Sequence, residues 1–457
     1  MILLMTTAPP SNAPWFHGKR LPPLGLMYIA AALEQAGHEV QMLDNYLMQQ
    51  STEEVQQLVL KLHPTIVGIT CGSATYKKCV ETAKAIKQVL PECQIIVGGW
   101  HASYMPESLL ETSEIDYAVM GEGERAITDL AAFLVKSDYS NASTVAGVAC
   151  RGSLGVVKNE PTFINMDELP FPARHLLPLE KYDRNIDFLN AKPVDIMSIS
   201  RGCTFNCGFC ETKKLWGNIS RQFSPQRVMA EVNDLVTNYG TKGIYFINDN
   251  FTIRKNQTAE FCDLLIKSKL DLEWICDTRV DLIDQNILEK MATAGCKTIW
   301  FGIESGSQKV LNYINRNITL EQVEEAFKMC RKAGIQIACS FMLGLPSETK
   351  EDLMASYRFA EKLDADWCQF NVFIAYPDSL LWREILETGK YTQLDDFLYS
   401  YKTNEFDYDE LMRIQRQFFK NYHRAPKRIL KRIKREGVLN FAKRRLHPKP
   451  IDNAGIA

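Results

Sequence analysis

Short apolar segments alternate with amphipathic helical segments along most of this 457-residue chain, and this alternation limits the folds that it can adopt. The first series of strand-like runs lies at Ile2 to Thr6, Glu39 to Leu43, Ile66 to Thr70, Gln94 to Val97 and Ile115 to Met120. Helical segments such as Leu24 to Gln35 separate these runs. Strands that alternate with helices predict an α/β fold that begins with a Rossmann-like, doubly wound parallel sheet.

A second series of strands and helices begins at Val194. Its strand-like runs lie at Val194 to Ile199, Gly243 to Ile247, Leu272 to Cys276, Lys297 to Ile303, Ile335 to Leu343 and Trp367 to Ile374. Six such units predict a partial (β/α)6 barrel of the TIM type. We therefore expect a first domain at residues 1–140, a proline-rich linker at 141–192, the barrel at 193–390 and a helical, basic region at 391–457.

Composition and charge indicate a globular protein in a reducing environment. Hydrophobic residues make up 46% of the chain and charged residues 24%, and the formal net charge of −2 argues against nucleic-acid binding. Thirteen cysteines are too dilute for a disulfide scaffold, which predicts a cytoplasmic location. The start, Met1 to Thr7, lacks the features of a signal peptide, and no apolar run approaches the roughly 20 residues that span a bilayer.

Three cysteines follow the strand-like run at Val194 to Ile199, in the spacing Cys203-x-x-x-Cys207-x-x-Cys210. Three thiolates can bind three irons of a [4Fe-4S] cluster, and the fourth iron is then open to a small molecule. Zinc is an alternative, but structural zinc sites have four ligands and no second cysteine pair lies nearby. Three buried structural cysteines are another alternative, yet such cysteines have no reason to crowd beside glycines.

This spacing, with the aromatic Phe209 just before the third cysteine, resembles the signature of the radical S-adenosylmethionine (SAM) superfamily. The resemblance implies that SAM chelates the open iron, that Phe209 lies near the adenine, and that Cys203, Cys207 and Cys210 form the catalytic cluster site. One electron from the cluster then cleaves SAM to methionine and a 5′-deoxyadenosyl radical, so an electron donor such as flavodoxin or ferredoxin is expected.

Further candidate residues lie at the ends of the later strands of the barrel. The family resemblance implies that Asp249 receives the SAM amine, although an Asx turn is an equal alternative. Arg279 could bind the methionine carboxylate through its planar fork, or form a surface salt bridge. The resemblance also implies that Glu304 contacts the ribose or amino group, and that Gly344 lies along the adenine. Tyr376, where relatives often carry a Pro-Gly-Thr run, is a candidate proton or hydrogen donor or an aromatic wall.

Small residues gather in three loops at strand ends of the first domain. These loops hold Cys71, Gly72 and Ser73; Gly98, Gly99 and His101; and Gly121 and Glu122. Together they favour a cofactor at the upper edge of the sheet. A nicotinamide cofactor is not expected, because the loop after the first strand lacks the Gly-x-Gly-x-x-Gly motif.

With these loops and the Pro23-Leu24-Gly25-Leu26 helix start, the first domain resembles the cobalamin-binding domain of many radical SAM enzymes. The Asp-x-His-x-x-Gly motif that supplies a cobalt ligand in other cobalamin proteins does not occur in the sequence. The resemblance therefore implies bound cobalamin without a protein ligand from that motif. His101 is expected either beside the corrin or in a surface or hydrogen-bonding role.

The region after Glu410 is rich in lysine and arginine interleaved with apolar residues, from Phe418 to Arg445. A basic amphipathic helix can lie on an anionic membrane, or it can pack on the barrel through its apolar face. The first alternative would suit a lipid-like substrate.

Over nearly its whole length the chain thus resembles cobalamin (B12)-dependent radical SAM enzymes. The resemblance to the class B methyltransferases implies C-methylation of an unactivated carbon in a small molecule or lipid. The chain also resembles the anaerobic Mg-protoporphyrin ester cyclases, which implies ring closure or rearrangement without methyl transfer as an alternative. A non-catalytic corrin- and redox-sensing module is the alternative outside enzymes.

Overall fold

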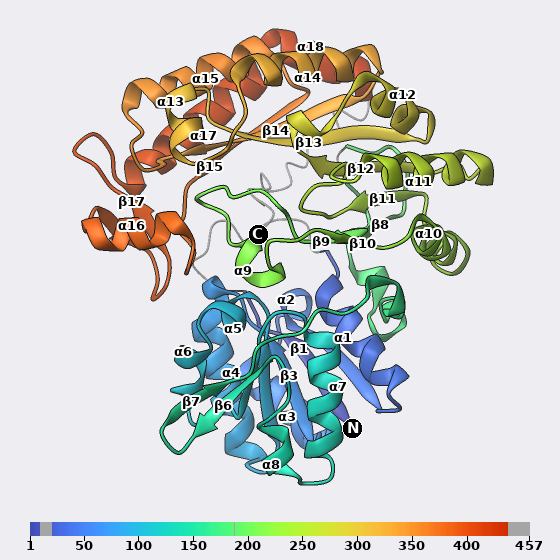
Figure 1. The fold of residues 1–457 in the computed structure, drawn as a ribbon, viewed down its shortest axis with the longest axis vertical. Helices are drawn as coiled ribbons and strands as arrows, with labels where there is room; N and C mark the ends of the chain where they lie inside the picture. The colour runs from blue at the N-terminus through green and yellow to red at the C-terminus, as the bar shows by residue number, and fades with distance from the viewer. Residues whose placement is uncertain (10–20, 187, 437–457) are drawn as a thin grey trace. The chain divides into compact units, whose positions relative to one another are not determined.

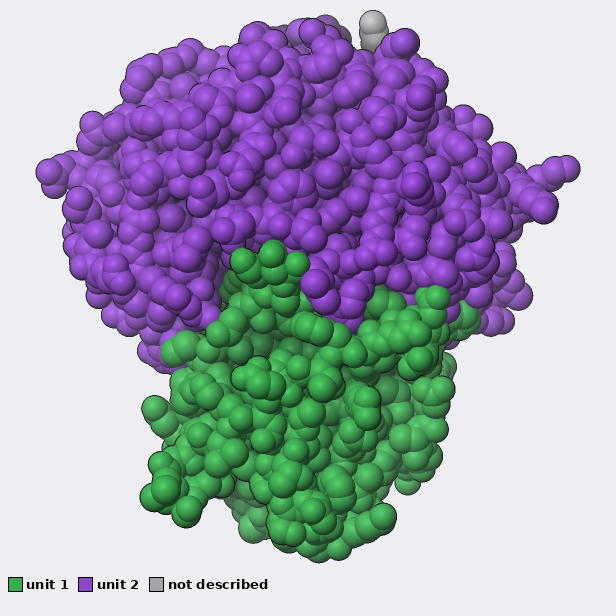
Figure 2. All heavy atoms as spheres, in the orientation of Figure 1, with its two compact units in different colours: residues 1–13, 20–183, 211–218 green, residues 14–19, 184–210, 219–457 purple. Residues whose placement is uncertain are grey.

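The computed structural model describes residues 1–9, 21–186 and 188–436, with side chains described up to residue 433. The chain divides into two compact units (Figure 2). Of the described residues, unit 1 comprises 1–9, 21–183 and 211–218, and unit 2 comprises 184–186, 188–210 and 219–436. In the described part of the chain, no helix is long and apolar enough to cross a membrane.

Unit 1 is built on a seven-stranded sheet in the order β2-β1-β3-β4-β5-β6-β7. Its five parallel strands are β1 (Ile2–Thr6), β2 (Val40–Asp44), β3 (Ile66–Thr70), β4 (Gln94–Gly98) and β5 (Tyr117–Val119). Every residue of β1 is buried, as expected for a parallel strand with helices on both faces of its sheet. These strands confirm the predicted doubly wound fold.

Helices cover both faces of this sheet (Figure 1). Apolar side chains of α1 (Leu24–Gln35) and α7 (Gly123–Leu134) pack on one face, and those of α3 (Thr52–Leu62) and α4 (Tyr76–Val89) pack on the other. Ser51 and Glu54 form a capping box at the start of α3, which satisfies two backbone N–H groups at that end.

The sequence predicts a linker at residues 141–192, but residues 141–183 belong to unit 1 and contribute secondary structure to it. Strands β6 (Val148–Gly152) and β7 (Gly155–Lys158) extend the sheet by antiparallel pairing with β5 and with each other. Short 3-10 turns follow, at Met166–Glu168, Arg174–Leu176 and Leu179–Lys181. The prolines of this segment exclude long helices but do not exclude a short hairpin.

Unit 2 contains a parallel six-stranded sheet in which the strands follow their order in the chain. They are β8 (Val194–Met197), β11 (Gly243–Phe246), β12 (Glu273–Thr278), β13 (Cys296–Glu304), β14 (Gln336–Leu343) and β15 (Trp367–Val372). Between them lie α10 (Pro225–Tyr239), α11 (Lys255–Ser268), α12 (Gln285–Thr293), α13 (Gln308–Tyr313), α14 (Leu320–Lys332) and α15 (Lys350–Leu363). This arrangement confirms the predicted partial barrel, and Figure 1 shows the helices on the outside of the curved sheet.

The open edge of the barrel at β15 is covered by α17 (Tyr408–Arg424). Gln415 donates a hydrogen bond from Nε2 to the Phe370 carbonyl over 3.0 Å, and His423 Nε2 lies 2.8 Å from the Cys368 carbonyl. Side chains of α17 thus satisfy carbonyl groups that a seventh strand would otherwise have to pair.

The basic helix α18 (Pro426–Glu436) packs within unit 2 through ion pairs. Lys427 and Arg428 lie 3.1 and 3.3 Å from the Asp364 carboxylate, and Lys431 lies 3.3 Å from that of Asp366. Leu430 remains 59% exposed. Residues 437–457, which hold the last basic residues of the sequence motif, lie outside the described residues.

Candidate functional site

The three cysteines of the sequence motif lie on one loop at the carboxyl end of β8. Cys207 is buried, Cys203 is half-buried and Cys210 is exposed. The loop begins with β9 (Ser200–Arg201), which pairs antiparallel with β10 (Arg221–Gln222). The loop is therefore fixed on one side before the first cysteine.

Three consecutive residues after β11 hold this cysteine loop. Asn248 accepts the backbone N–H groups of Ile199 and Ser200 at Oδ1, over 2.8 and 3.1 Å. Asp249 accepts the N–H of Gly202 at Oδ2 over 2.8 Å, and Asn250 donates from Nδ2 to Cys203 Sγ over 3.2 Å. The run that the sequence associates with SAM binding thus also positions the loop itself.

Two buried arginines converge on the sulfur of Cys207. Arg279 Nη1 lies 3.7 Å from Sγ, and Arg316 Nη1 lies 3.5 Å from it. The fork of Arg279 pairs with Asp281 over 2.9 and 3.0 Å, and its guanidinium carbon lies 3.7 Å above the centre of the Phe205 ring. The Nε and Nη2 groups of Arg279 therefore bind Asp281 and are not available to a ligand carboxylate.

The loop is also tied to two helices that follow later strands. Gly208 donates its N–H to the Ile314 carbonyl at the end of α13, and its own carbonyl accepts the N–H of Leu381 in α16 (Leu380–Thr388). Phe209 packs against an apolar cluster that includes Ile314, Leu345 and Leu381. The aromatic residue of the motif therefore lies in a mainly apolar environment.

Glu304 and Gly344 lie at the carboxyl ends of β13 and β14. Burial raises the pKa of the Glu304 carboxyl, and Arg316, whose Nη2 lies 3.6 Å from Oε1, opposes this shift. Gly344 has a φ of +84°, which favours glycine, and its N–H donates to Glu348 Oε2 over 2.6 Å. Both predicted residues are at the rim of the barrel.

Tyr376 follows the last strand of the barrel. It is half-buried, and its carbonyl accepts the Ser379 hydroxyl over 3.1 Å at the start of α16. This contact fixes the backbone of the segment and assigns no chemical role to the phenol.

Tyr245 and Asp277, from the neighbouring strands β11 and β12, form a hydrogen-bonded pair in unit 2. Tyr245 donates from its hydroxyl to Asp277 Oδ2 over 2.9 Å. Burial raises the pKa of Asp277 to about 7, and the tyrosine bond partly opposes this shift. The other oxygen, Oδ1, is buried without a hydrogen-bond partner among the described residues.

The donor set of the cysteine loop fits an iron–sulfur cluster. Within the described ranges, no group of three or more His, Cys, Asp or Glu side chains is arranged as a preformed metal site. However, three cysteines share one loop, and Asn250, Arg279 and Arg316 direct N–H groups at two of their sulfurs. Hydrogen bonds of this kind stabilise the anionic sulfur ligands of such clusters.

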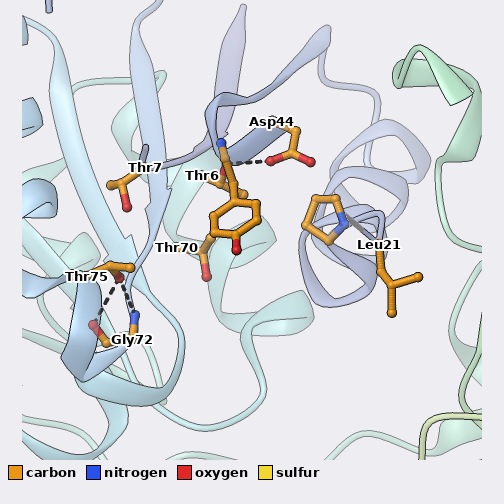
Figure 3. A pocket seen from close by; sticks show the side chains of 9 residues that line it. Thr6, Thr7, Leu21, Asp44, Thr70, Gly72 and Thr75 are labelled. Atoms are coloured by element: carbon orange, nitrogen blue, oxygen red, sulfur yellow. Dashed lines mark hydrogen bonds between the residues drawn. The ribbon is translucent and has the colours of Figure 1, made fainter. Parts of the chain in front are cut away.

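Unit 1 has a cavity of about 190 Å³ at the carboxyl ends of β1, β2 and β3 (Figure 3). The residues that line it are Thr6, Thr7, Leu21, Pro23, Asp44, Tyr46, Thr70, Gly72 and Thr75. Thr6 donates to Asp44 Oδ1 over 2.7 Å, and Tyr182 donates to the other Asp44 oxygen over 2.6 Å. The cavity lies where the strand order reverses between β1 and β3, a position at which α/β sheets bind ligands.

His101 is a buried hydrogen-bonding residue of unit 1. Its Nδ1 lies 3.1 Å from Ser73 Oγ, and its Nε2 lies 2.9 Å from Ser108 Oγ. Ser108 donates its own proton to the Met105 carbonyl, so the proton in the contact with His101 belongs to Nε2. Burial lowers the pKa of His101 to about 4, and both ring nitrogens are already engaged.

The other predicted cofactor residues of unit 1 have different surroundings. Gly72 lines the cavity, whereas Cys71 is 1% exposed and Glu122 accepts the N–H of Ile164 at Oε2. Gly98 ends β4, Gly121 donates its N–H to Ser103 Oγ, and a Cβ on Gly99 would lie 2.9 Å from the Cys71 carbonyl oxygen. Of these glycines, Gly72 alone is among the residues that line the cavity, and Gly99 lies against the backbone of Cys71.

Sequence reasoning missed several residues that shape these sites. Arg316 lies between α13 and α14, flanked by Asn315 and Asn317, whose φ angles are +53° and +51°. Nothing in the cysteine motif points to it, because it is 109 residues from Cys207. Thr6, Thr7 and Asp44 could have been predicted from the sequence. They are polar residues at the ends of β1 and β2 or directly after them, where α/β sheets bind ligands.

Comparison with known proteins identifies two family domains in the chain. The family profile of the Radical SAM superfamily matches residues 197–360, and that of the B12 binding domain matches residues 18–131. An uncharacterized methyltransferase of Pyrococcus horikoshii is 31% identical over 424 residues, which cover 90% of each chain. An anaerobic magnesium-protoporphyrin IX monomethyl ester cyclase of Rubrivivax gelatinosus is 29% identical over 82% of this chain and 68% of its own.

The fold is also shared with the cobalamin-dependent SAM radical enzyme OxsB, in a structure with aqua-cobalamin and SAM bound. The TM-score is 0.76 at 16% identity, over 99% of this chain and 71% of that chain. The chain therefore belongs to the family of cobalamin-dependent radical SAM enzymes that includes methyltransferases. It is an enzyme, and the cofactors of its family are a [4Fe-4S] cluster, SAM and cobalamin.

Proposed function

We propose that this enzyme transfers a methyl group to an unactivated carbon atom of a small molecule. The observation that carries the proposal is the loop of Cys203, Cys207 and Cys210, with N–H donors directed at two of its sulfurs. Methyl transfer is preferred over ring closure because the relative of 31% identity, matched over 90% of both chains, is named a methyltransferase.

Each cofactor has a set of residues that would hold it. Cys203, Cys207 and Cys210 would bind the cluster, and the rim of unit 2 with Phe209, Asp249, Glu304 and Gly344 would bind SAM. When bound, the cluster supplies the electron that splits SAM into methionine and a 5′-deoxyadenosyl radical, and cobalamin supplies the methyl group. The chain itself holds these groups and excludes water around them.

The cavity of unit 1 would hold part of the cobalamin. At about 190 Å³ it is small for a corrin ring but suits a tail of the cofactor. Threonine hydroxyls and the Asp44 carboxylate give it hydrogen-bonding groups, while Leu21 and Pro23 add apolar surface. His101 is not proposed as a cobalt ligand, because Ser73 and Ser108 engage both of its nitrogens.

The remaining partners are proposed by class. An electron donor such as a flavodoxin or ferredoxin would reduce the cluster in a reducing cytoplasm. For the basic carboxyl-terminal region, packing within unit 2 is proposed in place of a membrane contact, since Lys427, Arg428 and Lys431 pair with Asp364 and Asp366.

The test uses the full chain, reconstituted without oxygen with iron, sulfide and cobalamin. It is incubated with SAM that carries a deuterated methyl group, a low-potential reductant and a small-molecule extract. We expect one 5′-deoxyadenosine and one S-adenosylhomocysteine for each labelled methyl group found in a product. Cys207→Ser should abolish both compounds, whereas Cys262→Ala, at a buried cysteine outside the loop, should retain them.

Two outcomes would contradict the proposal. Formation of 5′-deoxyadenosine without labelled product or S-adenosylhomocysteine would indicate a radical reaction without methyl transfer, as the cyclase name suggests. A reconstituted protein that holds a cluster but never cleaves SAM would reject the radical reaction altogether.

A further inference from the structure

The two arginines on Cys207 differ in how well their charges are neutralised. Arg279 is 2% exposed and pairs with Asp281 through two hydrogen bonds of 2.9 and 3.0 Å. Arg316 is 8% exposed, and its carboxylate neighbour, Glu304, lies 3.6 Å away at Oε1. Arg316 therefore has the weaker countercharge although it lies closer to the sulfur, at 3.5 Å against 3.7 Å.

The surroundings of Arg316 hold its guanidinium in this position. Its backbone N–H donates to the Leu311 carbonyl over 2.9 Å, and its carbonyl accepts Arg279 Nη2 over 2.8 Å. Its Nη2 donates to the Gly302 carbonyl, and a Cβ on Gly302 would lie only 3.0 Å from the same nitrogen. The contact between Arg316 and Cys207 is therefore built by the fold and is not a chance approach of a mobile surface side chain.

An arginine in this position has a defined effect on a bound cluster. Arginine stays protonated in proteins, so Arg316 contributes a permanent buried positive charge. A cluster gains one negative charge when it accepts one electron from a flavin or iron–sulfur donor. A nearby cation, and an N–H···S bond to a ligand sulfur, both stabilise this reduced form and raise the reduction potential.

We propose that Arg316 sets the reduction potential of the cluster, whereas Arg279, neutralised by Asp281, chiefly holds the cysteine loop. This inference rests on the proposed function, since it requires a cluster on Cys207. Arg316 is a positioning and tuning residue and is not assigned a contact with substrate.

The test measures the midpoint potential of the reconstituted protein by redox titration followed by electron paramagnetic resonance. The variants are Arg316→Gln and Arg279→Gln, and Arg358→Gln is the control because its side chain is 55% exposed and pairs with Glu351 on the same helix. We expect Arg316→Gln to lower the midpoint by at least about 59 mV, a tenfold change in the one-electron equilibrium. Arg279→Gln should shift it less, and Arg358→Gln should leave it unchanged.

The outcomes separate this inference from the proposed function. A wild-type protein that takes up no iron and sulfide contradicts the proposed function. A loaded Arg316→Gln protein with the wild-type midpoint, or with a smaller shift than Arg279→Gln, overturns the inference alone.

A second measurement covers the case in which Arg316→Gln does not load. Wild-type protein labelled with ¹⁵N-arginine is reduced, and nitrogen coupling to the cluster is measured by pulsed electron paramagnetic resonance in wild type and in Arg279→Gln. We expect coupling that persists in Arg279→Gln, because Arg316 remains. Loss of all coupling in that variant, or none in wild type, overturns the inference.

Discussion

Asn248 accepts the backbone N–H of Ile199 through its side-chain Oδ1 over 2.8 Å, and this bond joins the end of β11 to the start of the cysteine loop. The same oxygen accepts the N–H of Ser200 over 3.1 Å. The geometry of the cysteine loop therefore depends on a side chain that is not itself a cluster ligand.

The first prediction concerns this side chain. Asn248→Ala should lower the free energy of unfolding by about 1–3 kcal/mol, because it leaves two backbone donors without their acceptor. Asn248→Asp keeps an acceptor oxygen for both N–H groups, but it replaces Nδ2, which has no partner among the described residues, with a second carboxylate oxygen and adds a negative charge. Thermal unfolding of the apo protein and iron content after reconstitution measure both effects. Equal iron content and stability in wild type and Asn248→Ala would show that the bond does not hold the loop.

The second prediction concerns the pH dependence contributed by Glu348. Burial raises the pKa of this carboxyl to about 8 from an ordinary 4.5, although the N–H groups of Gly344 and Leu345 oppose the shift. Between these two values the folded protein binds the proton more tightly than the unfolded chain. Stability should therefore fall as pH rises from about 4.5 to about 8, by up to about 1.4 kcal/mol per pH unit.

Glu348→Gln tests this prediction because its side-chain oxygen can still accept both backbone N–H groups. Denaturant unfolding is measured between about pH 5 and pH 8, which lies between the two pKa values. The free energy of unfolding of the variant should depend less on pH than that of wild type. The same slope in the two proteins would mean that Glu348 does not titrate in this range.

The third prediction compares two glycines with left-handed backbones. Gly344 has a φ of +84° and an added Cβ would overlap Leu411 of α17, whereas Gly334 has a φ of +74° with nothing within 4 Å. Gly334→Ala should cost about 1–2 kcal/mol of stability from backbone strain alone. Gly344→Ala should cost about 1–3 kcal/mol more because of overpacking. Equal losses of unfolding free energy in the two variants, measured by denaturant unfolding, would indicate that Leu411 of α17 can move to make room for the added methyl group.

The fourth prediction concerns His101. Its pKa is about 4 in the folded protein against 6.5 ordinarily, so the unfolded chain binds the proton more readily between these values. Stability should fall as pH drops from about 6.5 to about 4, by up to about 1.4 kcal/mol per pH unit, and His101→Gln should reduce this slope. His423, whose pKa is also lowered to about 4, should keep the remaining slope in the variant.

The same histidine gives a spectroscopic expectation. With both ring nitrogens engaged by serines, protein-bound cobalamin in its Co(II) state should show no nitrogen splitting from His101 in its paramagnetic resonance spectrum. A splitting in wild type that disappears in His101→Gln would contradict this expectation and assign the ligand.

The sequence predicted what depends on local pattern. The parallel strands and the cysteine loop were predictable because apolar periodicity and ligand spacing are read from neighbouring residues. Strands β6 and β7 were not, since a short hairpin beside prolines gives little periodic signal. Arg316 and the burial of His101 were not predictable either, because each depends on side chains that only the folded chain brings together.

Helix α9 (Thr212–Trp216) lies within unit 1, although Cys210, two residues before it, belongs to unit 2. Tyr104 of unit 1 donates a hydrogen bond to the Glu211 carbonyl over 3.1 Å, and the chain re-enters unit 2 after Asn218. A single recombination point in the gene therefore cannot replace one unit with that of a relative without separating α9 from the rest of unit 1, against which it packs. We therefore expect the two units to be inherited together in evolution. A hybrid of two relatives should fold only when α9 and unit 1 come from the same parent protein.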